Sequence, residues 1–245
     1  MITIPESTQA VRSHKTEKVL LDRTREWLMK EERAGGIHAS DLLDPLQAYW
    51  RHTSPQPLGD RQVPIFMIGK VLHAFILSAI DGEKGTNWDS DQGSKTSDVI
   101  GIVYSQDHNI SGIPREVKTS RSFYEPKDLK DLDMYVEQLL IYMAAEQSTK
   151  GQLWVLYLNL RDEQQRTSPG FRAYTITVSP EDLAKVTAEL KATAALLKNA
   201  LEKKTPTALP LCRQWKCGEK MCEFWGKECK PEGRYPLKTK KSWKA

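Results

Sequence analysis

The order in which helical and strand patterns alternate is the feature that most limits the fold of this chain. Helical patterns come first, two strand-like runs follow, and then come a helix, two more strand-like runs and a long final helix. A chain of this kind buries its apolar faces by packing helices against a sheet. We therefore predict an α/β fold with a central mixed sheet flanked by helices. The expected helices are at about 15–33, 45–50, 64–80, 132–147 and 180–203, and the expected strands are 98–104, 113–118, 152–160 and 171–178.

The length and composition are those of an ordinary globular protein. The chain has 245 residues, of which 39% are apolar and 28% charged, enough for one well-buried domain and a small appendage. No apolar run reaches the roughly 20 residues that span a bilayer, and the N-terminus lacks a signal-peptide pattern, so we expect a cytoplasmic protein without a membrane partner. We divide the chain into a main domain at 1–205, a cysteine segment at 206–232 and a basic tail at 233–245.

Two acids and a lysine lie in neighbouring predicted strands. Glu116 and Lys118 are two residues apart in one strand, so their side chains point to the same side. Asp98 opens the preceding strand, and a hairpin would bring it beside Glu116. Paired carboxylates bind Mg²⁺ or Mn²⁺, and a nearby ammonium stabilises charge developing on a phosphate. The E-x-K pattern alone is more typical of an exposed ion pair.

Three further polar residues fall in predicted helices. His73 is embedded in the apolar helix at 64–80, where an imidazole is either satisfied within the core or acts as a metal ligand. Gln138 and Tyr142 are one turn apart on a single face of the helix at 132–147. They form either the polar edge of an amphipathic helix or a pair that reaches towards the sheet end and a DNA backbone.

The order of these elements resembles that of the RecB-like nucleases of the PD-(D/E)XK superfamily. G-x-x-x-H at 69–73, an aspartate opening a strand, E-x-K in the next strand and Q-x-x-x-Y in the following helix stand in the family order over about 40–160. The family often has a glycine two residues before the aspartate, which this chain lacks, and Asp89 and Asp91 are rival acids nearby. The resemblance implies a nuclease in which His73, Asp98, Glu116 and the Val117 carbonyl bind Mg²⁺ or Mn²⁺, Lys118 is catalytic, and Gln138 and Tyr142 position DNA or the lysine.

All four cysteines lie close together near the end of the chain. In a reducing compartment, clustered cysteines indicate a metal site more than disulfides. Four thiolates hold either Zn²⁺ or an iron–sulfur cluster, and the absence of a C-x-x-C pair lowers the weight on zinc. The candidate ligands are Cys212, Cys217, Cys222 and Cys229.

The cysteine segment resembles the iron–sulfur branch of the same family, which includes CRISPR-associated exonucleases. In that branch a fourth cysteine precedes a proline and an aromatic helix near the N-terminus. Here Asp44 precedes Pro45, and Cys212 would supply the fourth thiolate. The resemblance implies a [4Fe–4S] cluster, with Zn²⁺ as the alternative, that clamps the C-terminal segment onto the core.

Together these patterns predict a DNA exonuclease that acts on single strands or ends, in recombination, repair or CRISPR adaptation. A non-catalytic DNA-binding adaptor and a restriction-type endonuclease are the alternatives. The net charge of +4 supports DNA binding weakly, and six basic residues against one acid from Lys230 to Ala245 make either a phosphate-binding tail or a solvated end. Candidate stacking or core aromatics are Trp50, Trp88, Tyr124 and Trp154.

Overall fold

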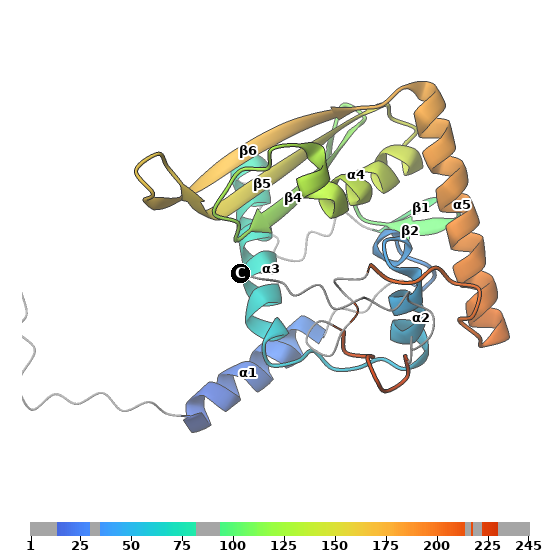
Figure 1. Ribbon diagram of the computed structural model, residues 1–245, viewed down its shortest axis with the longest axis horizontal. Coiled ribbons are helices and arrows are strands. Elements are labelled where there is room, and N and C mark those ends of the chain that lie inside the picture. Colours follow the sequence, from blue (N-terminus) through green and yellow to red (C-terminus); the bar gives the residue numbers. More distant parts are fainter. Residues whose placement is uncertain (1–13, 30–34, 82–93, 214–216, 218–221, 230–245) are drawn as a thin grey trace, which may run out of the picture.

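The computed structural model describes residues 14–29, 35–81, 94–213, 217 and 222–229 (Figure 1). The basic tail, Trp88, Asp89 and Asp91 lie outside the described residues. The helices are α1 (His14–Met29), η1 (Ala39–Leu42), α2 (Pro45–Thr53), α3 (Gln62–Asp81), η3 (Leu129–Leu132), α4 (Asp133–Ala145) and α5 (Pro180–Lys203). The strands are β1 (Lys95–Ser97), β2 (Ile102–Tyr104), β3 (His108–Ile110), β4 (Ile113–Ser120), β5 (Lys150–Arg161) and β6 (Thr167–Thr177).

A four-stranded mixed sheet forms the centre of the fold. Its order is β3-β4-β5-β6; β4 and β5 are parallel, and the two outer pairs are antiparallel. The parallel pair requires a crossover connection, which α4 provides. The α/β fold with a central mixed sheet flanked by helices, predicted from the sequence, is therefore confirmed.

The two faces of the sheet pack against different helices (Figure 1). Side chains alternate along β4 and β5, so Val117 and Leu156 pack with Ile76 of α3. Leu153 and Val155 lie in the larger core, which contains most of the buried residues of α4. Both helices thus lie close to β4, the strand that carries the E-x-K sequence.

Gly151 allows α4 to approach the start of β5 closely. A Cβ atom at this position would lie 2.8 Å from Met143 Sδ and 3.0 Å from Leu139 Cδ1, both on α4. A side chain at this position would force Met143 or Leu139 to move. The absence of a side chain therefore lets α4 pack directly on the start of β5.

The final helix has recognisable capping signals at both ends. The Ser179 hydroxyl accepts the Asp182 N–H at 3.1 Å, and Pro180 occupies the first helical position. Lys204 ends α5 in a left-handed conformation. The end of α5 packs with α2 and the cysteine segment in a second core, which includes Leu46, Tyr49, Leu197, Leu209, Cys212, Phe224 and Cys229.

Helix α3 is unusually apolar for a helix with so much exposed surface. Within the described residues it is the helix long and apolar enough to cross a bilayer: the window Gln62–Ala79 has a mean hydropathy of 1.5, although the sequence predicted no such stretch. Only 11% of that window is buried, and Phe75 is 67% exposed. Its other side packs on β4, however, so length and composition are weak grounds for a membrane span.

Two local predictions are wrong around residues 98–111. The strand expected at 98–104 begins with a turn, because Gly101 has a positive φ of 78°, and only β2 remains of it. This strand pairs with β1 in a separate two-stranded sheet. The segment between the strands expected at 98–104 and 113–118 contains the short strand β3, which was not predicted and which joins the main sheet.

Candidate active site

A tight hairpin between β3 and β4 places an acid opposite Glu116. Ser111 and Gly112 both have positive φ, at 55° and 76°, as a two-residue turn with right-handed strand twist requires. In this register His108 pairs with Arg115, so Asp107, the residue just before His108, lies opposite Glu116. Asp107 Oδ2 accepts the Val117 N–H at 2.6 Å, which fixes this carboxylate against β4.

His73 reaches the same carboxylate from α3. Its Nε2 atom lies 3.0 Å from Asp107 Oδ1, yet this buried nitrogen has no hydrogen bond of good geometry. Burial by itself would raise the pKa of Asp107, but contact with His73, the charge of Lys118 and the Val117 N–H together hold it below its usual value. Asp107 is thus kept as a carboxylate.

Glu116 is a fully buried carboxyl in contact with Lys118. Burial, reinforced by the charge of Asp107, raises the pKa of Glu116 to about 8. The Lys118 ammonium forms an ion pair with Glu116, yet neither Glu116 oxygen receives a hydrogen bond of good geometry. Burial would lower the pKa of Lys118, but the charges of Glu116 and Asp107 raise it, so the lysine stays charged.

Tyr142 and Gln138 support the site from α4. Gln138 Nε2 donates to the Tyr142 hydroxyl at 2.9 Å, as the one-turn spacing suggests. Tyr142 is 3% exposed; burial first, and then the charges of Glu116 and Asp107, raise its pKa well above its ordinary value. A side chain so buried lies beside the Glu116 carboxyl instead of reaching outward to a DNA backbone.

The donor set around Asp107 suits a hard divalent cation. His73 Nε2 and both oxygens of Glu116 are buried polar atoms without a well-formed hydrogen bond, next to a second carboxylate. Oxygen ligands with one imidazole fit Mn²⁺ or Mg²⁺. In the described part of the chain, no three histidine, cysteine, aspartate or glutamate side chains already stand in the arrangement of a metal site. Instead His73 pairs with Asp107, and Lys118 with Glu116.

The structure does not bring Asp98 into this group. It is exposed in the turn between β1 and β2, whose sheet is separate from that of β4. The strongest charges on Glu116 come from Asp107 and Lys118. The expected pairing of Asp98 with Glu116 is wrong because the strand before β4 in the sheet is β3, and the acid next to β3 is Asp107.

The cysteine segment gathers its thiols beside α2. Cys212 and Cys229 are buried, Cys217 and Cys222 are partly buried against the same core, and none forms a disulfide. Burial, together with the charges of Asp44 and Cys217, raises the pKa of Cys212 to about 12. A buried thiol of this kind ionises readily only beside a cation. The charge of Asp44 acts on Cys212, so this residue, which stands where the iron–sulfur branch has a cysteine, lies near the thiols.

The stacking candidates from the sequence lie apart from one another. Trp50 packs edge-on against Tyr49 in the second core, with ring centroids 5.0 Å apart. The Arg115 guanidinium covers Trp154, 5.0 Å from the ring centroid. Tyr124, in contrast, is 61% exposed beyond the end of β4. Of the described candidates, Tyr124 is therefore the one with an exposed ring.

Comparison with known proteins supports the fold at low sequence identity. No family model matches the chain, and no curated protein matches it in sequence. The crystal structure of SSO0001 is similar over 84% of this chain and 92% of that one, with a TM-score of 0.52 and 23% identity, which shows a shared fold alone. An alkaline exonuclease (LHK-Exo) from Laribacter hongkongensis matches 75% of this chain and 95% of its own, with a TM-score of 0.44 and 16% identity. A superposition this loose says nothing about chemistry.

Proposed function

We propose that this protein is a metal-dependent DNA nuclease that hydrolyses phosphodiester bonds. The observation that carries the proposal is the meeting of His73, Asp107, Glu116 and Lys118, with buried ligand atoms that lack good hydrogen bonds. These groups come from α3, the start of the β3–β4 hairpin and β4. The sequence resemblance to RecB-like nucleases supports the same chemistry, with Asp107 in the role first expected of Asp98.

Each site residue has a role that its position supports. His73, Asp107, Glu116 and the Val117 carbonyl would hold Mg²⁺ or Mn²⁺, which polarises the phosphate and lowers the pKa of a bound water. Lys118 stays charged and stabilises the negative charge that develops on the phosphate. Tyr142, held by Gln138, orients the Glu116 carboxyl.

The proposed substrate is DNA with a single-stranded end. The direct test is incubation of the purified full-length protein with Mg²⁺ or Mn²⁺ and either linear or circular single-stranded DNA. We expect the linear strand to be degraded and the circle to survive, as for an exonuclease. Cleavage of both would make the protein an endonuclease. Tight binding without cleavage of either would replace the proposal with a DNA-binding adaptor.

We further propose that the four cysteines hold a [4Fe–4S] cluster, with Zn²⁺ as the alternative ligand. Two buried and two partly buried thiols pack into or against the second core, and Cys212, Cys217 and Cys222 lie near enough to affect one another's pKa, which supports this proposal. A cluster there would join the C-terminal segment to α2 and so stabilise the second core.

Metal content distinguishes the two cofactors. Anaerobically purified protein is expected to be brown, with about four iron atoms per chain. Cys222→Ser, at a partly buried position, is expected to lose most of the iron and to lower the melting temperature. Ser148→Ala, a change outside the cysteine segment, should leave the iron content unchanged. Colourless protein with one zinc per chain would select zinc, and protein with neither metal would refute a cofactor here.

A further inference from the structure

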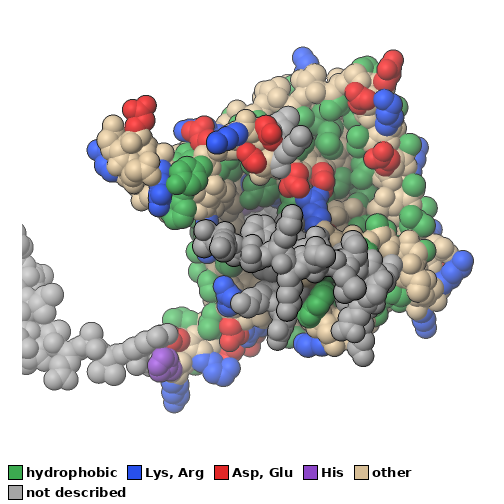
Figure 2. All heavy atoms as spheres, in the orientation of Figure 1, with side chains coloured by type: hydrophobic (Ala, Val, Ile, Leu, Met, Phe, Trp, Pro, Cys, Tyr) green, Lys and Arg blue, Asp and Glu red, His purple; other side chains and the backbone are tan. Residues whose placement is uncertain are grey.

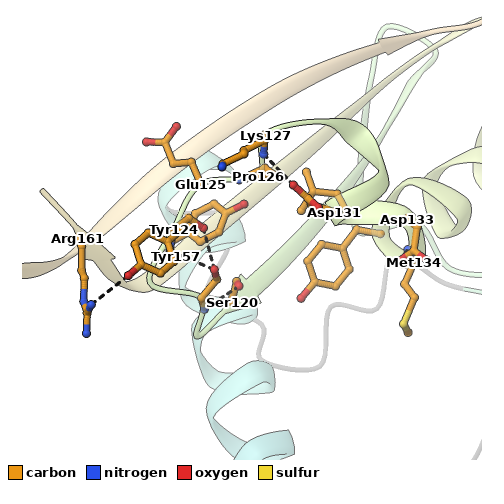
Figure 3. A pocket seen from close by; sticks show the side chains of 13 residues that line it. Ser120, Tyr124, Glu125, Pro126, Lys127, Asp131, Asp133, Met134, Tyr157 and Arg161 are labelled. Atoms are coloured by element: carbon orange, nitrogen blue, oxygen red, sulfur yellow. Dashed lines mark hydrogen bonds between the residues drawn. The ribbon is translucent and has the colours of Figure 1, made fainter. Parts of the chain in front are cut away.

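A cavity of about 960 Å³ opens beyond the C-terminal end of β4 (Figure 3). It lies between the loop after β4, the start of α4 and the end of β5, and its lining includes Ser120, Tyr124, Tyr135, Tyr157 and Arg161. Ligands of sheets with parallel strands commonly bind outside the carboxyl ends of those strands, as this cavity lies outside β4 and β5. Its size is at the upper end of the range of about 300–1,000 Å³ for small-ligand pockets.

The cavity adjoins the candidate active site along β4. Ser120 lies two residues after Lys118, on the same face of β4. Tyr135 lines the cavity and lies near enough to Lys118 for the two side chains to interact electrostatically. A DNA strand with one phosphate at Lys118 would therefore continue along β4 into this cavity.

Aromatic rings and an arginine form an exposed platform at the cavity mouth. Tyr124 is 61% exposed and Phe123 is 42% exposed. The Arg161 guanidinium lies 4.7 Å from the Phe123 ring centroid and 5.7 Å from that of Tyr124, and it donates to the Tyr124 hydroxyl at 3.1 Å. Flat rings beside a cation suit the face of an unpaired base and its phosphate.

The platform is held in place before any ligand binds. The Arg161 backbone N–H donates to the Phe123 carbonyl at 2.9 Å, which ties the loop after β4 to the end of β5. The Ser122 hydroxyl donates to the Tyr124 carbonyl at 2.7 Å, and the Ser122 N–H donates to the Ser120 hydroxyl at 3.2 Å. A loop ordered in advance loses little entropy when it binds.

The acids around the cavity already have partners of their own. Glu125 forms an ion pair with Arg172, and Asp133 accepts from Arg213 Nη1 at 2.8 Å. Asp131 accepts the Lys127 backbone N–H at 2.8 Å. Arg161 has no carboxylate partner among the described residues, so its charge remains for a phosphate. Figure 2 shows basic, acidic and apolar side chains intermixed on this side of the molecule.

A buried hydroxyl points to a polar ligand inside the cavity. Tyr157 lines it, is 1% exposed, and its hydroxyl has no hydrogen bond of good geometry; burial first, and then the nearby Tyr174, raise the pKa of this hydroxyl. A buried hydroxyl without a good partner is destabilising unless a ligand or water completes it. The heteroatoms of a base or sugar would do so.

We propose that this cavity binds unpaired nucleotides of the cleaved DNA strand, next to the phosphate at Lys118, with a base stacked on Tyr124 and a phosphate on Arg161. This inference rests on the proposed nuclease function and adds single-stranded DNA as the ligand of a defined subsite. Bases within a duplex already stack on their neighbours and offer no free face, so a paired end would have to open before it enters.

The test measures binding separately from cutting. In a Lys118→Ala background, the affinity for a fluorescent oligothymidylate is measured by anisotropy for Tyr124→Ala and Tyr124→Phe. Loss of one base–ring stack is expected to weaken binding by the alanine variant by about 5- to 100-fold, while the phenylalanine variant, which keeps the ring, stays within about threefold. Phe171→Ala, another exposed aromatic outside the cavity lining, is the matched control and should bind normally.

Abasic substitutions then locate the stacked base. Removing one base at successive positions of the oligonucleotide should weaken binding at one position, and that loss should vanish in Tyr124→Ala, because both changes remove the same stack. If wild-type protein cuts single strands but Tyr124→Ala binds the oligonucleotide with normal affinity, the subsite is refuted and the nuclease proposal stands. The same conclusion follows if Tyr124→Ala loses affinity for duplex DNA by the same factor as for single-stranded DNA. If wild-type protein neither cuts nor binds, both proposals fail.

Discussion

Replacing Lys118 by alanine is expected to reduce DNA cleavage at least 100-fold while leaving DNA affinity within a few-fold of wild type. In the proposed reaction the ammonium is the charged group that meets the developing negative charge on the phosphate, and loss of one such preorganised group lowers rates by about 10²–10³. Binding persists because many contacts share the attraction for the backbone. Single-turnover cleavage of linear single-stranded DNA at saturating Mn²⁺ measures the first effect, and anisotropy measures the second.

The control for this variant is another lysine of the same sheet. Lys150 is exposed at the start of β5, and Lys150→Ala should cut at the wild-type rate. Glu116→Gln keeps the shape of the buried side chain but cannot provide the carboxylate that would hold the metal, so this variant should be as inactive as Lys118→Ala. Normal cutting by both Lys118→Ala and Glu116→Gln would show that the active site lies elsewhere.

Asp107→Asn and Asp98→Asn are expected to differ sharply. Asparagine at 107 can still accept the Val117 N–H through its carbonyl, so the hairpin should survive, but the charge beside His73 is lost. We expect cleavage to fall at least 100-fold and the Mn²⁺ concentration for half-maximal rate to rise. Asp98 is exposed in a turn of another sheet, so its substitution should leave the rate within about twofold.

Thermal melting of the two aspartate variants separates chemistry from folding. Both should melt near the wild-type temperature, because neither change removes apolar contacts. If Asp98→Asn were inactive and Asp107→Asn active, the assignment of Asp98 made from the sequence would be restored. The assignment of Asp107 from the hairpin geometry would then be contradicted. Equal and normal activity in both would mean that the second carboxylate ligand is a different residue.

Most regular elements follow from local signals in the sequence. The long helix α5 has Ser179 and Pro180 at its start, and β5 has a continuous apolar run, so both are visible in isolation. The same holds for Glu116 and Lys118, because alternation along one strand places them on one face. Residues whose partners lie within the same element are thus predictable.

The identity of the second acid depends on pairing between elements and was missed. β3 has only three residues, too few for a periodic pattern, and the Gly101 turn interrupts the apolar run that suggested a strand from 98. One signal was present: Ser111-Gly112 suits a two-residue hairpin turn, and Asn109 Oδ1 accepts the Gly112 N–H at 3.0 Å. Counting back from that turn pairs Asp107, not Asp98, with Glu116.

The parallel pairing of β4 and β5 has a consequence for the growing polypeptide. Strand β4, which carries Glu116 and Lys118, has no neighbour on one side until α4 has crossed the sheet and β5 has been synthesised. All the proposed ligands and Lys118 precede α4, so a nascent chain carries every one of these groups well before it has the scaffold that aligns them. The proposed site is therefore assembled late in synthesis, with closure of a non-local contact, which is among the slower steps of folding.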